Sequence, residues 1–347
     1  MALSVSALTS LLLVALLVFF LLSVNFNGPF DRVPLSGPPS EPTPPPAASA
    51  PPGGAGYTDI LPNNIDDVVL PATANSFPVH LVRFYKKSPV RPDDNLCWLE
   101  CVSLLSIMLY IRPPAIYVHT NHPDFWPFDS CDGLIDDWSS VKLVYRRRRF
   151  VVNGKRLNST DKFIAHEADV AKLVTLHKYG GITSDFDVFF LPNITSVLGL
   201  LGRGYDCLVS KEETFMKKMN HGFIACHRGA AYIADILQSY RNDYRAKEWV
   251  YNSGMVPWNI HHSSAVYNRT VYVDDEIINN PGPETVLRFI RGQDRSVDWR
   301  RKPAFHSLFH DCQYNRTNAT RMDTGFAELL TSILDEAHRR RPQIKGS

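Results

Sequence analysis

Residues 165–188 read AHEADVAKLVTLHKYGGITSDFDV, and this stretch decides which kind of fold the chain can form. It begins with a helical pattern whose apolar residues include Val170, Leu173 and Val174, continues into a Gly-Gly pair, and ends in an extended segment. Glycine directly after the last periodic residue is typical of a helix C-terminus. A helix that passes through a tight turn into a strand is half of an alternating α/β unit.

The same alternation continues on both sides of this stretch. Apolar runs alternate with longer segments in which apolar residues recur at helical spacing. This order favours an α/β fold with a Rossmann-type, mostly parallel sheet and helices on both faces, in which ligands bind beyond the carboxyl ends of the strands. The expected strands are residues 79–84, 115–119, 182–191 and 207–210, and the expected helices are residues 95–110, 160–179 and 230–244.

Two carboxylates follow the Gly-Gly pair. Asp185 and Asp187 are two residues apart in a segment expected to be extended, so both side chains should project to one face while Phe186 points into the core. Two hard oxygen ligands with open positions suit Mg²⁺ or Mn²⁺ bound together with substrate phosphates. Two aspartates at this spacing also fit a solvated strand end, so the pattern by itself leaves both interpretations open.

The preceding helix carries a second charged pair. Asp169 and Lys172 are three residues apart and share one helix face. They could approach the two carboxylates from the helix side, or they could form a surface ion pair worth at most ~1 kcal/mol.

The N-terminal part of the chain has a different composition. Residues 5–24 contain no charge, and about 20 apolar residues in a helix span the hydrocarbon layer of a bilayer. We expect residues 1–4 to be a short cytosolic tail and residues 5–24 a transmembrane signal anchor. A cleaved signal peptide is the alternative, disfavoured because no basic segment precedes the apolar run. Ten of the 25 prolines lie in residues 29–52, so residues 25–75 should form an extended luminal stem.

The remaining residues, 76–347, are expected to form the luminal catalytic domain. The chain contains six cysteines and five Asn-x-Ser/Thr sequons, and together these indicate that the domain lies in an oxidising, luminal compartment. The net charge of +2 gives no electrostatic reason to expect a nucleic-acid partner. The sequons, as expected glycosylation sites, are Asn158, Asn193, Asn268, Asn315 and Asn318.

Two cysteines, Cys97 and Cys101, lie four residues apart on an expected helix face. This spacing resembles half of a zinc site, but no second Cys/His pair with matching spacing follows. Disulfide bonds or buried thiols are the favoured interpretation, and the connectivity does not follow from the sequence.

The segment 165–188 resembles the DXD-containing region of a family of retaining glycosyltransferases that includes animal α-1,4-galactosyltransferases, α-1,4-N-acetylglucosaminyltransferases and yeast α-mannosyltransferase relatives. The family pattern is a helix with Asp-x-x-Arg, then Tyr-Gly-Gly-Ile-Tyr, then x-Asp-x-Asp. Lys172 replaces the usual Arg, keeping the charge but not the bidentate fork, and Thr183 replaces the usual aromatic residue. The matching residues are Asp169, Tyr179, Gly180, Gly181, Ile182, Asp185 and Asp187.

The resemblance implies a GT-A fold, a nucleotide-sugar donor and Mn²⁺ or Mg²⁺ as cofactor. It implies that Asp187 binds the metal directly, that Asp185 contacts the donor ribose and metal-bound water, and that Lys172 neutralises charge on the departing diphosphate. The other donor-binding residues that it implies are Asp169, Tyr179, Gly180 and Gly181.

Weaker matches lie outside this segment. Asn220 resembles an asparagine that the family places near the sugar and the acceptor, with a turn entering a core strand as the equally open alternative. His306 fits a late histidine that some relatives use as a third metal ligand, and His310 is the second choice. Phe84 or Tyr85 could stack on the donor base, although core packing is the default for both.

The function expected from these features is that of a Golgi glycosyltransferase. It would be a single-pass type II membrane protein that transfers a hexose or N-acetylhexosamine, with a UDP-sugar as the expected donor, to a glycan acceptor on lipid or protein, with retention of configuration. The alternatives are a transferase-derived protein that binds sugar or nucleotide with weak or no turnover, and a secreted metal-dependent phosphohydrolase.

Three further clusters lie outside the segment 165–188. Residues 146–149, a run of four arginines, could meet an acidic glycan or form a protease site for shedding, and a solvated loop face is the favoured interpretation. His261 with His262 is interpreted as structural. Residues 274–276 form an acidic cluster typical of a turn, which could also face the acceptor.

Overall fold

The computed structural model describes residues 77–86, 94–148, 151–157, 164–211, 217–274, 282–308, 314–315, 317 and 322–344. All of them belong to one compact unit, Pro44–Ser347. No helix among these residues is long and apolar enough to cross a bilayer. The expected anchor (residues 5–24), the expected stem (residues 25–75), two of the sequons, Asn158 and Asn318, and His310 lie outside the described residues.

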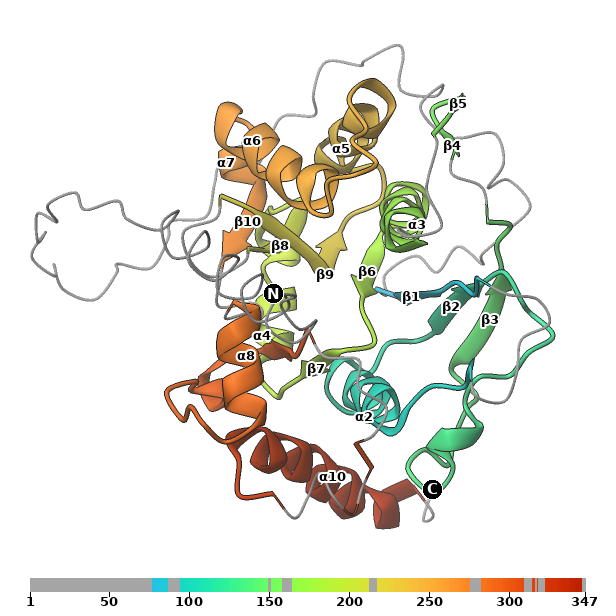
Figure 1. The fold of residues 1–347 in the computed structure, drawn as a ribbon, viewed down its shortest axis with the longest axis vertical. Coiled ribbons are helices and arrows are strands. Elements are labelled where there is room, and N and C mark those ends of the chain that lie inside the picture. Colours follow the sequence, from blue (N-terminus) through green and yellow to red (C-terminus); the bar gives the residue numbers. More distant parts are fainter. Residues whose placement is uncertain are drawn as a thin grey trace, which may run out of the picture. The chain divides into compact units, whose positions relative to one another are not determined.

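A seven-stranded sheet forms the centre of this unit, in the order β10-β8-β9-β6-β1-β2-β3 (Figure 1). Every neighbouring pair is parallel except those made by β9, which runs antiparallel to β6 and to β8. The predicted mostly parallel α/β sheet is therefore confirmed. The strands are β1 (Val79–Arg83), β2 (Ile116–Thr120), β3 (Val141–Tyr145), β6 (Gly181–Ser184), β8 (Cys207–Lys211), β9 (Met219–Cys226) and β10 (Val271–Asp274).

The central strands are buried on both faces, as their continuous apolar sequences predict. In β1, Val79 pairs with Ile116 of β2, and Leu81 with Val118, and all four side chains are fully buried. On the other side of β6, strand β9 is buried along its whole length. Helices must therefore cover both faces, and they do.

Two helical layers enclose the sheet (Figure 1). On one face α3 (Ile164–Tyr179) and α5 (Ala231–Asn242) pack with β8, β9 and β10 in one apolar cluster, beside α6 (Val256–Ser263) and α7 (Tyr267–Thr270). On the other face a larger cluster is built from α2 (Trp98–Ser106), α8 (Pro283–Ile290) and α10 (Gly325–Ile344), with α4 (Ile194–Leu198) beside them. α3 directly precedes β6 and runs in the opposite direction to it. The N-terminus of α3 therefore lies at the carboxyl edge of the sheet.

The segment expected as one strand, residues 182–191, is two strands in the structure. β6 ends at Ser184, and the chain turns before β7 (Val188–Phe190), which leaves the main sheet and pairs antiparallel with β11 (Ala304–His306). The extended geometry predicted for Asp185 and Asp187 is therefore wrong, because both lie in the connecting turn. The core position predicted for Phe186 is confirmed.

The remaining elements are short. The expected helix at residues 95–110 is α2 followed by a π-helical turn, Ile107–Ile111, which ends at Arg112 with φ 52° before two prolines. The other short elements are β4 (Val151–Val152), β5 (Lys155–Arg156), the 3₁₀ turns Asp129–Cys131, Leu201–Arg203 and Trp299–Arg301, and the π-helical turn Tyr251–Met255.

Two disulfide bonds join these elements. Cys101 of α2 is bonded to Cys131, and Cys207 of β8 is bonded to Cys226, its register partner on β9. The bond to Cys131 uses the sulfur of Cys101, so the zinc half-site considered for Cys97 and Cys101 is excluded, and the predicted disulfide chemistry is confirmed. Cys97 itself is buried.

Candidate metal centre and its surroundings

The turn between β6 and β7 is held in place from both sides. The amide of Asp185 donates a hydrogen bond to the carbonyl of Gly222 on the neighbouring strand β9, at 3.0 Å. On the other side the amide and hydroxyl of Ser307 donate to the carbonyl of Asp187, at 2.9 and 3.2 Å. The two aspartates are therefore fixed by backbone bonds to segments that lie far away in the sequence.

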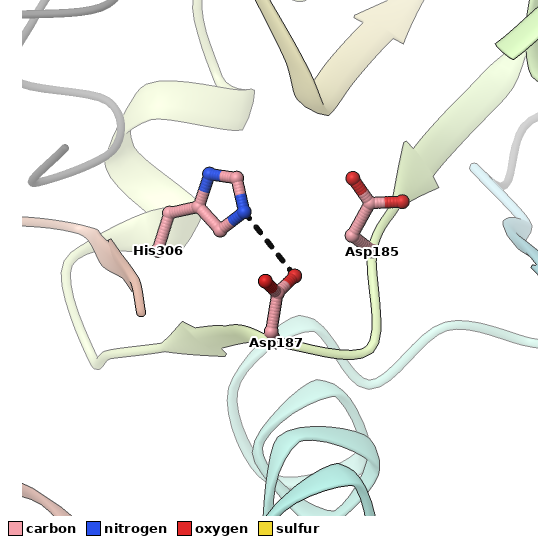
Figure 2. A group of neighbouring side chains, drawn as sticks. All are labelled: Asp185, Asp187 and His306. Atoms are coloured by element: carbon pink, nitrogen blue, oxygen red, sulfur yellow. Dashed lines mark ion pairs between the residues drawn. The ribbon is translucent and has the colours of Figure 1, made fainter. Parts of the chain in front are cut away.

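A histidine completes the group. β11 pairs with β7 so that His306 lies opposite Val188, the residue after Asp187. This register brings His306 Nε2 to 3.2 Å from Asp187 Oδ1 (Figure 2). Burial by itself lowers the pKa of His306, but the charges of Asp187 and Asp185 and the hydrogen bond to Asp187 outweigh it, so the pKa is raised above its ordinary value.

Asp185, Asp187 and His306 have the composition and spacing of a metal site. One ligand atom of each lies within 4.8 Å of the others, and the three side chains come from two backbone segments, the turn that holds both aspartates and the strand β11 that ends at His306 (Figure 2). Two carboxylate oxygens and one imidazole nitrogen suit Mn²⁺ or Mg²⁺, with Mn²⁺ better matched to the nitrogen ligand. Asp187 and His306 are buried while the Asp185 side chain is 34 % exposed, so one side of the group faces solvent and would leave coordination positions for a substrate.

Asp185, Asp187 and His306 are called the metal-binding group from here on, as a candidate site. Lys172 links this group to α3. Its Nζ lies 2.6 Å from Asp185 Oδ1 and 3.3 Å from Asp169 Oδ1, and it donates to the carbonyl of His221 at 3.3 Å. Burial opposes the charge of the ammonium group, but the two carboxylates outweigh it and raise the pKa of Lys172. A buried, permanently charged cation therefore stands beside the exposed carboxylate, and the surface ion pair considered from the sequence is excluded.

Neither spacing nor a motif singled out His221, which lies in the same cluster. Its Nδ1 is 3.8 Å from Asp169 Oδ1, and its side chain is buried. Burial, with a further contribution from Lys172, lowers the pKa of His221 to about 4 in spite of Asp169. The ring is therefore neutral at physiological pH. A single histidine inside an apolar strand sequence is not distinguishable from a core residue, which is why the pattern did not reveal it.

Gly222 was also missed, and its role is steric. A Cβ at this position would come within 2.7 Å of Asn220 Oδ1 and within 2.8 Å of His306 Cε1. The Gly222 amide also donates to Asn220 Oδ1 at 2.6 Å. Asn220, predicted to lie near the sugar, therefore lies beside His306, and the absence of a side chain at Gly222 makes this approach possible.

Three residues expected to bind the donor lie elsewhere. Gly181 is the first residue of β6 and pairs near the start of β1, whereas Asp185 follows the last residue of β6, so the whole strand separates the Gly-Gly pair from the metal-binding group. A Cβ at Gly181 (φ 103°) would come within 2.5 Å of the Pro78 carbonyl. Tyr179 contacts the ring of His80 at the same end of the sheet. The structure therefore places Tyr179, Gly180 and Gly181 in the turn from α3 into β6, at the other end of the strand from the carboxylates, and a role for them in donor binding stays a prediction.

Tyr85 follows β1 at the carboxyl edge of the sheet, where the donor is expected to bind. Its amide donates to Asn121 Oδ1 at 2.8 Å, and its carbonyl accepts from Asn121 Nδ2 at 3.0 Å. The ring is buried and packs edge-on against His122 and Phe125. The structure therefore shows core packing for Tyr85, and base stacking by Phe84 or Tyr85 stays a prediction.

Two of the four arginines, Arg146 and Arg148, have partners inside the fold. Arg146 is buried and donates to His119 Nδ1 and to Thr175 Oγ1 of α3, both at 2.8 Å. Arg148 pairs with Glu167 near the start of α3, with Nε to Oε2 at 2.7 Å. The interpretation of these two arginines was wrong because their partners come from α3 and β2, and the sequence does not show that proximity. Both attach α3 to the segment that follows β3.

The remaining predicted residues have surface or structural positions. Asn193, Asn268 and Asn315 are exposed, as glycosylation requires, and their modification stays a prediction. His261 is buried with Nε2 3.3 Å from the carbonyl of Val271, and the ring of His262 stacks on Trp258. Of the acidic cluster, only the backbone of Asp274 lies within the described residues.

Comparison with known families identifies the segment that carries this group. Residues 127–201 match the sequence model of the family described as "Glycosyltransferase sugar-binding region containing DXD motif". The matched segment includes α3, the Gly-Gly turn and both aspartates of the metal-binding group. The resemblance to DXD-containing glycosyltransferases is thereby confirmed.

Solved structures with a similar fold include several glycosyltransferases. Galactosyltransferase LgtC, in complex with donor and acceptor sugar analogues, matches with 12 % identity and a TM-score of 0.41 over 74 % of this chain and 95 % of that chain. The bifunctional glycosyltransferase WbbM matches with 12 % identity and a TM-score of 0.47 over 78 % and 53 %. Mouse xyloside xylosyltransferase 1 matches with 10 % identity and a TM-score of 0.37 over 66 % and 97 %. These values are too low to carry an activity over to this chain. A comparison with curated protein sequences finds no match.

Proposed function

We propose that this protein is a metal-dependent glycosyltransferase of GT-A type that transfers a hexose or N-acetylhexosamine from a nucleotide-sugar, a UDP-sugar in the first instance, to a glycan acceptor with retention of configuration. The observation that carries this proposal is the convergence of Asp185, Asp187 and His306 at the carboxyl edge of the sheet, with a buried lysine beside them. Two of the three lie in the segment that matches the DXD family.

Each residue of the group has a definable part in such a reaction. Asp185, Asp187 and His306 would hold Mn²⁺ or Mg²⁺, which supplies Lewis-acid stabilisation of a departing diphosphate. Lys172 keeps a fixed positive charge at the exposed side of the group, where negative charge would develop on the leaving group. Asp169 orients Lys172 through their 3.3 Å contact. Retention would follow from attack of the acceptor hydroxyl on the same face of the sugar that the leaving group departs from, and we assign no covalent nucleophile.

A second candidate function is binding of a nucleotide-sugar with little turnover. The ion pair between Lys172 and Asp185 favours it, because a carboxylate that is already neutralised by a buried cation has less charge to offer a metal. This candidate predicts donor binding without donor cleavage.

We further propose a Golgi membrane location, as a type II protein with a luminal catalytic domain. The uncharged segment 5–24, the proline-rich segment 25–75 and the five sequons support it. The disulfides Cys101–Cys131 and Cys207–Cys226 also support it, because such bonds persist in oxidising compartments. Protease protection in isolated microsomes is the test: the domain should be resistant until the membrane is opened, and digestion in intact vesicles would contradict the location.

The activity is tested with the purified full chain and a panel of UDP-galactose, UDP-N-acetylglucosamine and GDP-mannose, with and without Mn²⁺. We expect release of the nucleoside diphosphate from one donor, only with metal, and loss of that release in Asp187→Asn. Asp137→Asn is the matched control, since Asp137 is exposed and its hydrogen bond to the Ser139 amide survives the change. Unchanged turnover in Asp187→Asn would contradict the metal role, and donor binding without cleavage would favour the second candidate. The anomeric configuration of the product, read by NMR, tests retention.

A further inference from the structure

An exposed tryptophan stands on a segment next to the metal-binding group. Trp249 lies between α5 and α6 and is 57 % exposed, the largest fraction among the exposed large apolar side chains of the described residues. Exposing an indole in water is unfavourable, and this cost is offset when the exposed ring binds a ligand. The backbone and the ring of Trp249 are held in place by contacts with neighbouring residues.

The carbonyl of Trp249 is attached to α3. His166 Nε2 lies 3.1 Å from this carbonyl, and since a carbonyl only accepts, Nε2 carries the proton and donates it. In the neutral ring Nδ1 then accepts from the hydroxyl of Tyr244, 2.9 Å away. His166 is buried and lies one helical turn before Asp169, which contacts Lys172. The ring of Trp249 also lies against the ring of His166, with centroids 5.9 Å apart. Trp249 is therefore held against α3 about one helical turn from Asp169, the partner of the lysine that touches Asp185.

The segment that carries Trp249 is also ordered by its own bonds. Asn252 is buried, accepts from the amide of Arg245 at 3.0 Å and donates to the carbonyl of Asp243 at 2.9 Å. The hydroxyl of Tyr251 donates to Asp243 at 2.6 Å, and the guanidinium of Arg245 stacks on the ring of Tyr251. An exposed ring on such a segment loses little conformational entropy when it binds a ligand.

The far end of the same segment reaches the strand that borders the metal-binding group. The π-helical turn Tyr251–Met255 packs against β9, and a Cβ at Gly254 would come within 3.1 Å of the carbonyl of Met219. The next residue is Asn220, which lies beside His306. Residues 243–255 therefore cross from the N-terminus of α3 to the N-terminus of β9, along the edge of the sheet where the carboxylates lie.

We propose that the indole of Trp249 is the stacking platform for a pyranose ring of the acceptor glycan. This inference rests on the proposed transferase function, which requires a second sugar to approach the metal-binding group. The apolar face of a pyranose matches a flat aromatic ring, while polar groups at its edge suit sugar hydroxyls. His166 is a positioning residue for this platform, because it donates to the backbone carbonyl of Trp249 and its ring lies against the indole.

The test is glycan-array binding by the full chain, using arrays of galactose-, N-acetylglucosamine- and mannose-terminated oligosaccharides. We expect the unsubstituted chain to bind a subset, Trp249→Ala to bind that subset about tenfold more weakly, and Trp249→Phe to recover most of the signal. Tyr145→Ala is the matched control, because Tyr145 is an exposed aromatic residue on β3, at the other end of the sheet. The substitution Trp249→Ala keeps the backbone carbonyl that accepts from His166 but removes the ring contact with His166, and Trp249→Phe keeps both an aromatic ring and the carbonyl.

Donor cleavage in the absence of acceptor separates this proposal from the function on which it rests. Trp249→Ala should leave that rate and the thermal midpoint unchanged. Equal array binding by Trp249→Ala and the unsubstituted chain, or no array binding by the unsubstituted chain, overturns the platform even if donor cleavage is found. Loss of donor cleavage in Trp249→Ala also overturns it, since the ring would then act on the metal-binding group. Selective loss of array binding in a chain that cleaves no donor would leave the platform standing and contradict the transferase.

Discussion

Lys172 Nζ lies 2.6 Å from Asp185 Oδ1, although the two residues belong to different elements and are separated by the turn from α3 into β6. Through this contact the positive charge of Lys172, which belongs to α3, lies directly beside a carboxylate of the metal-binding group. It also explains why Lys172 can be buried, because its charge is matched by Asp185 and by Asp169.

Removing this lysine should impair both the reaction and the fold. In Lys172→Met the carboxylates of Asp169 and Asp185 lose their common partner, and we expect the free energy of unfolding to fall by about 2 kcal/mol, less than for a fully buried pair because Asp185 is partly exposed. Loss of the fixed charge at the leaving group should lower kcat about 100-fold. Chemical denaturation and donor-cleavage kinetics measure the two effects. Lys142→Met, at an exposed position on β3, should change neither, and an unchanged kcat in Lys172→Met would contradict the assigned role.

Removing the histidine should affect metal binding more than stability. In His306→Ala the group keeps its two carboxylates but loses its nitrogen ligand, so we expect affinity for Mn²⁺ to fall about 10- to 100-fold while affinity for Mg²⁺ falls less. Isothermal titration with each ion measures this difference. His262→Ala serves as control, because that ring is exposed on α6, where it stacks on Trp258 and meets His261 edge-on. Equal affinities in His306→Ala and the unsubstituted chain would show that His306 is no ligand.

A substitution at Gly222 tests whether the absence of a side chain there is needed for the approach of Asn220 and His306. In Gly222→Ala the new methyl group would meet Asn220 Oδ1 and the ring of His306 at less than a normal contact distance. We expect a loss of about 1–3 kcal/mol in the free energy of unfolding, together with weaker Mn²⁺ binding, because the ring of His306 must move. Gly202→Ala is the matched control, since nothing lies within 4 Å of a Cβ there. A Gly222→Ala protein with normal stability and metal affinity would refute the argument.

Two buried histidines should make the protein sensitive to acid. His80 Nδ1 and His119 Nε2 are 3.1 Å apart, and burial, together with the charge of Arg146, lowers the pKa of His80 to about 3 and that of His119 well below its ordinary value. Between about pH 6.5 and pH 3 the unfolded chain therefore binds more protons than the folded protein, so stability falls as the pH falls through this window. The slope is at most ~1.4 kcal/mol per pH unit for each histidine.

Denaturant unfolding at a series of pH values measures this slope. His80→Gln removes one of the two groups and should reduce the loss of stability between pH 6 and pH 4, even if it lowers stability at pH 7. His262→Gln, at an exposed histidine, should leave the slope as it is. A slope that does not change in His80→Gln would mean that His80 is not responsible.

The sequence by itself determined the local structure and the chemistry of one segment. Helical periodicity up to Tyr179, the Gly-Gly pair and the alternation of elements were sufficient to predict α3, the strand after it and a mostly parallel sheet, because these depend on neighbours in the chain. The same segment contains Asp169, Lys172, Asp185 and Asp187, and its resemblance to a family predicts roles for them.

Which residues meet in the candidate metal site depends on the tertiary fold. Strand pairing between β7 and β11 brings His306 to Asp187 across more than a hundred residues, and pairing between β6 and β9 brings Gly222 to Asp185. The same pairing shows that Gly181, although close to the carboxylates in sequence, lies at the far end of β6. Periodicity reports which face a residue occupies but not which distant segment lies against it. Strand register, set by packing of the whole core, therefore assembled the metal-binding group and its surroundings.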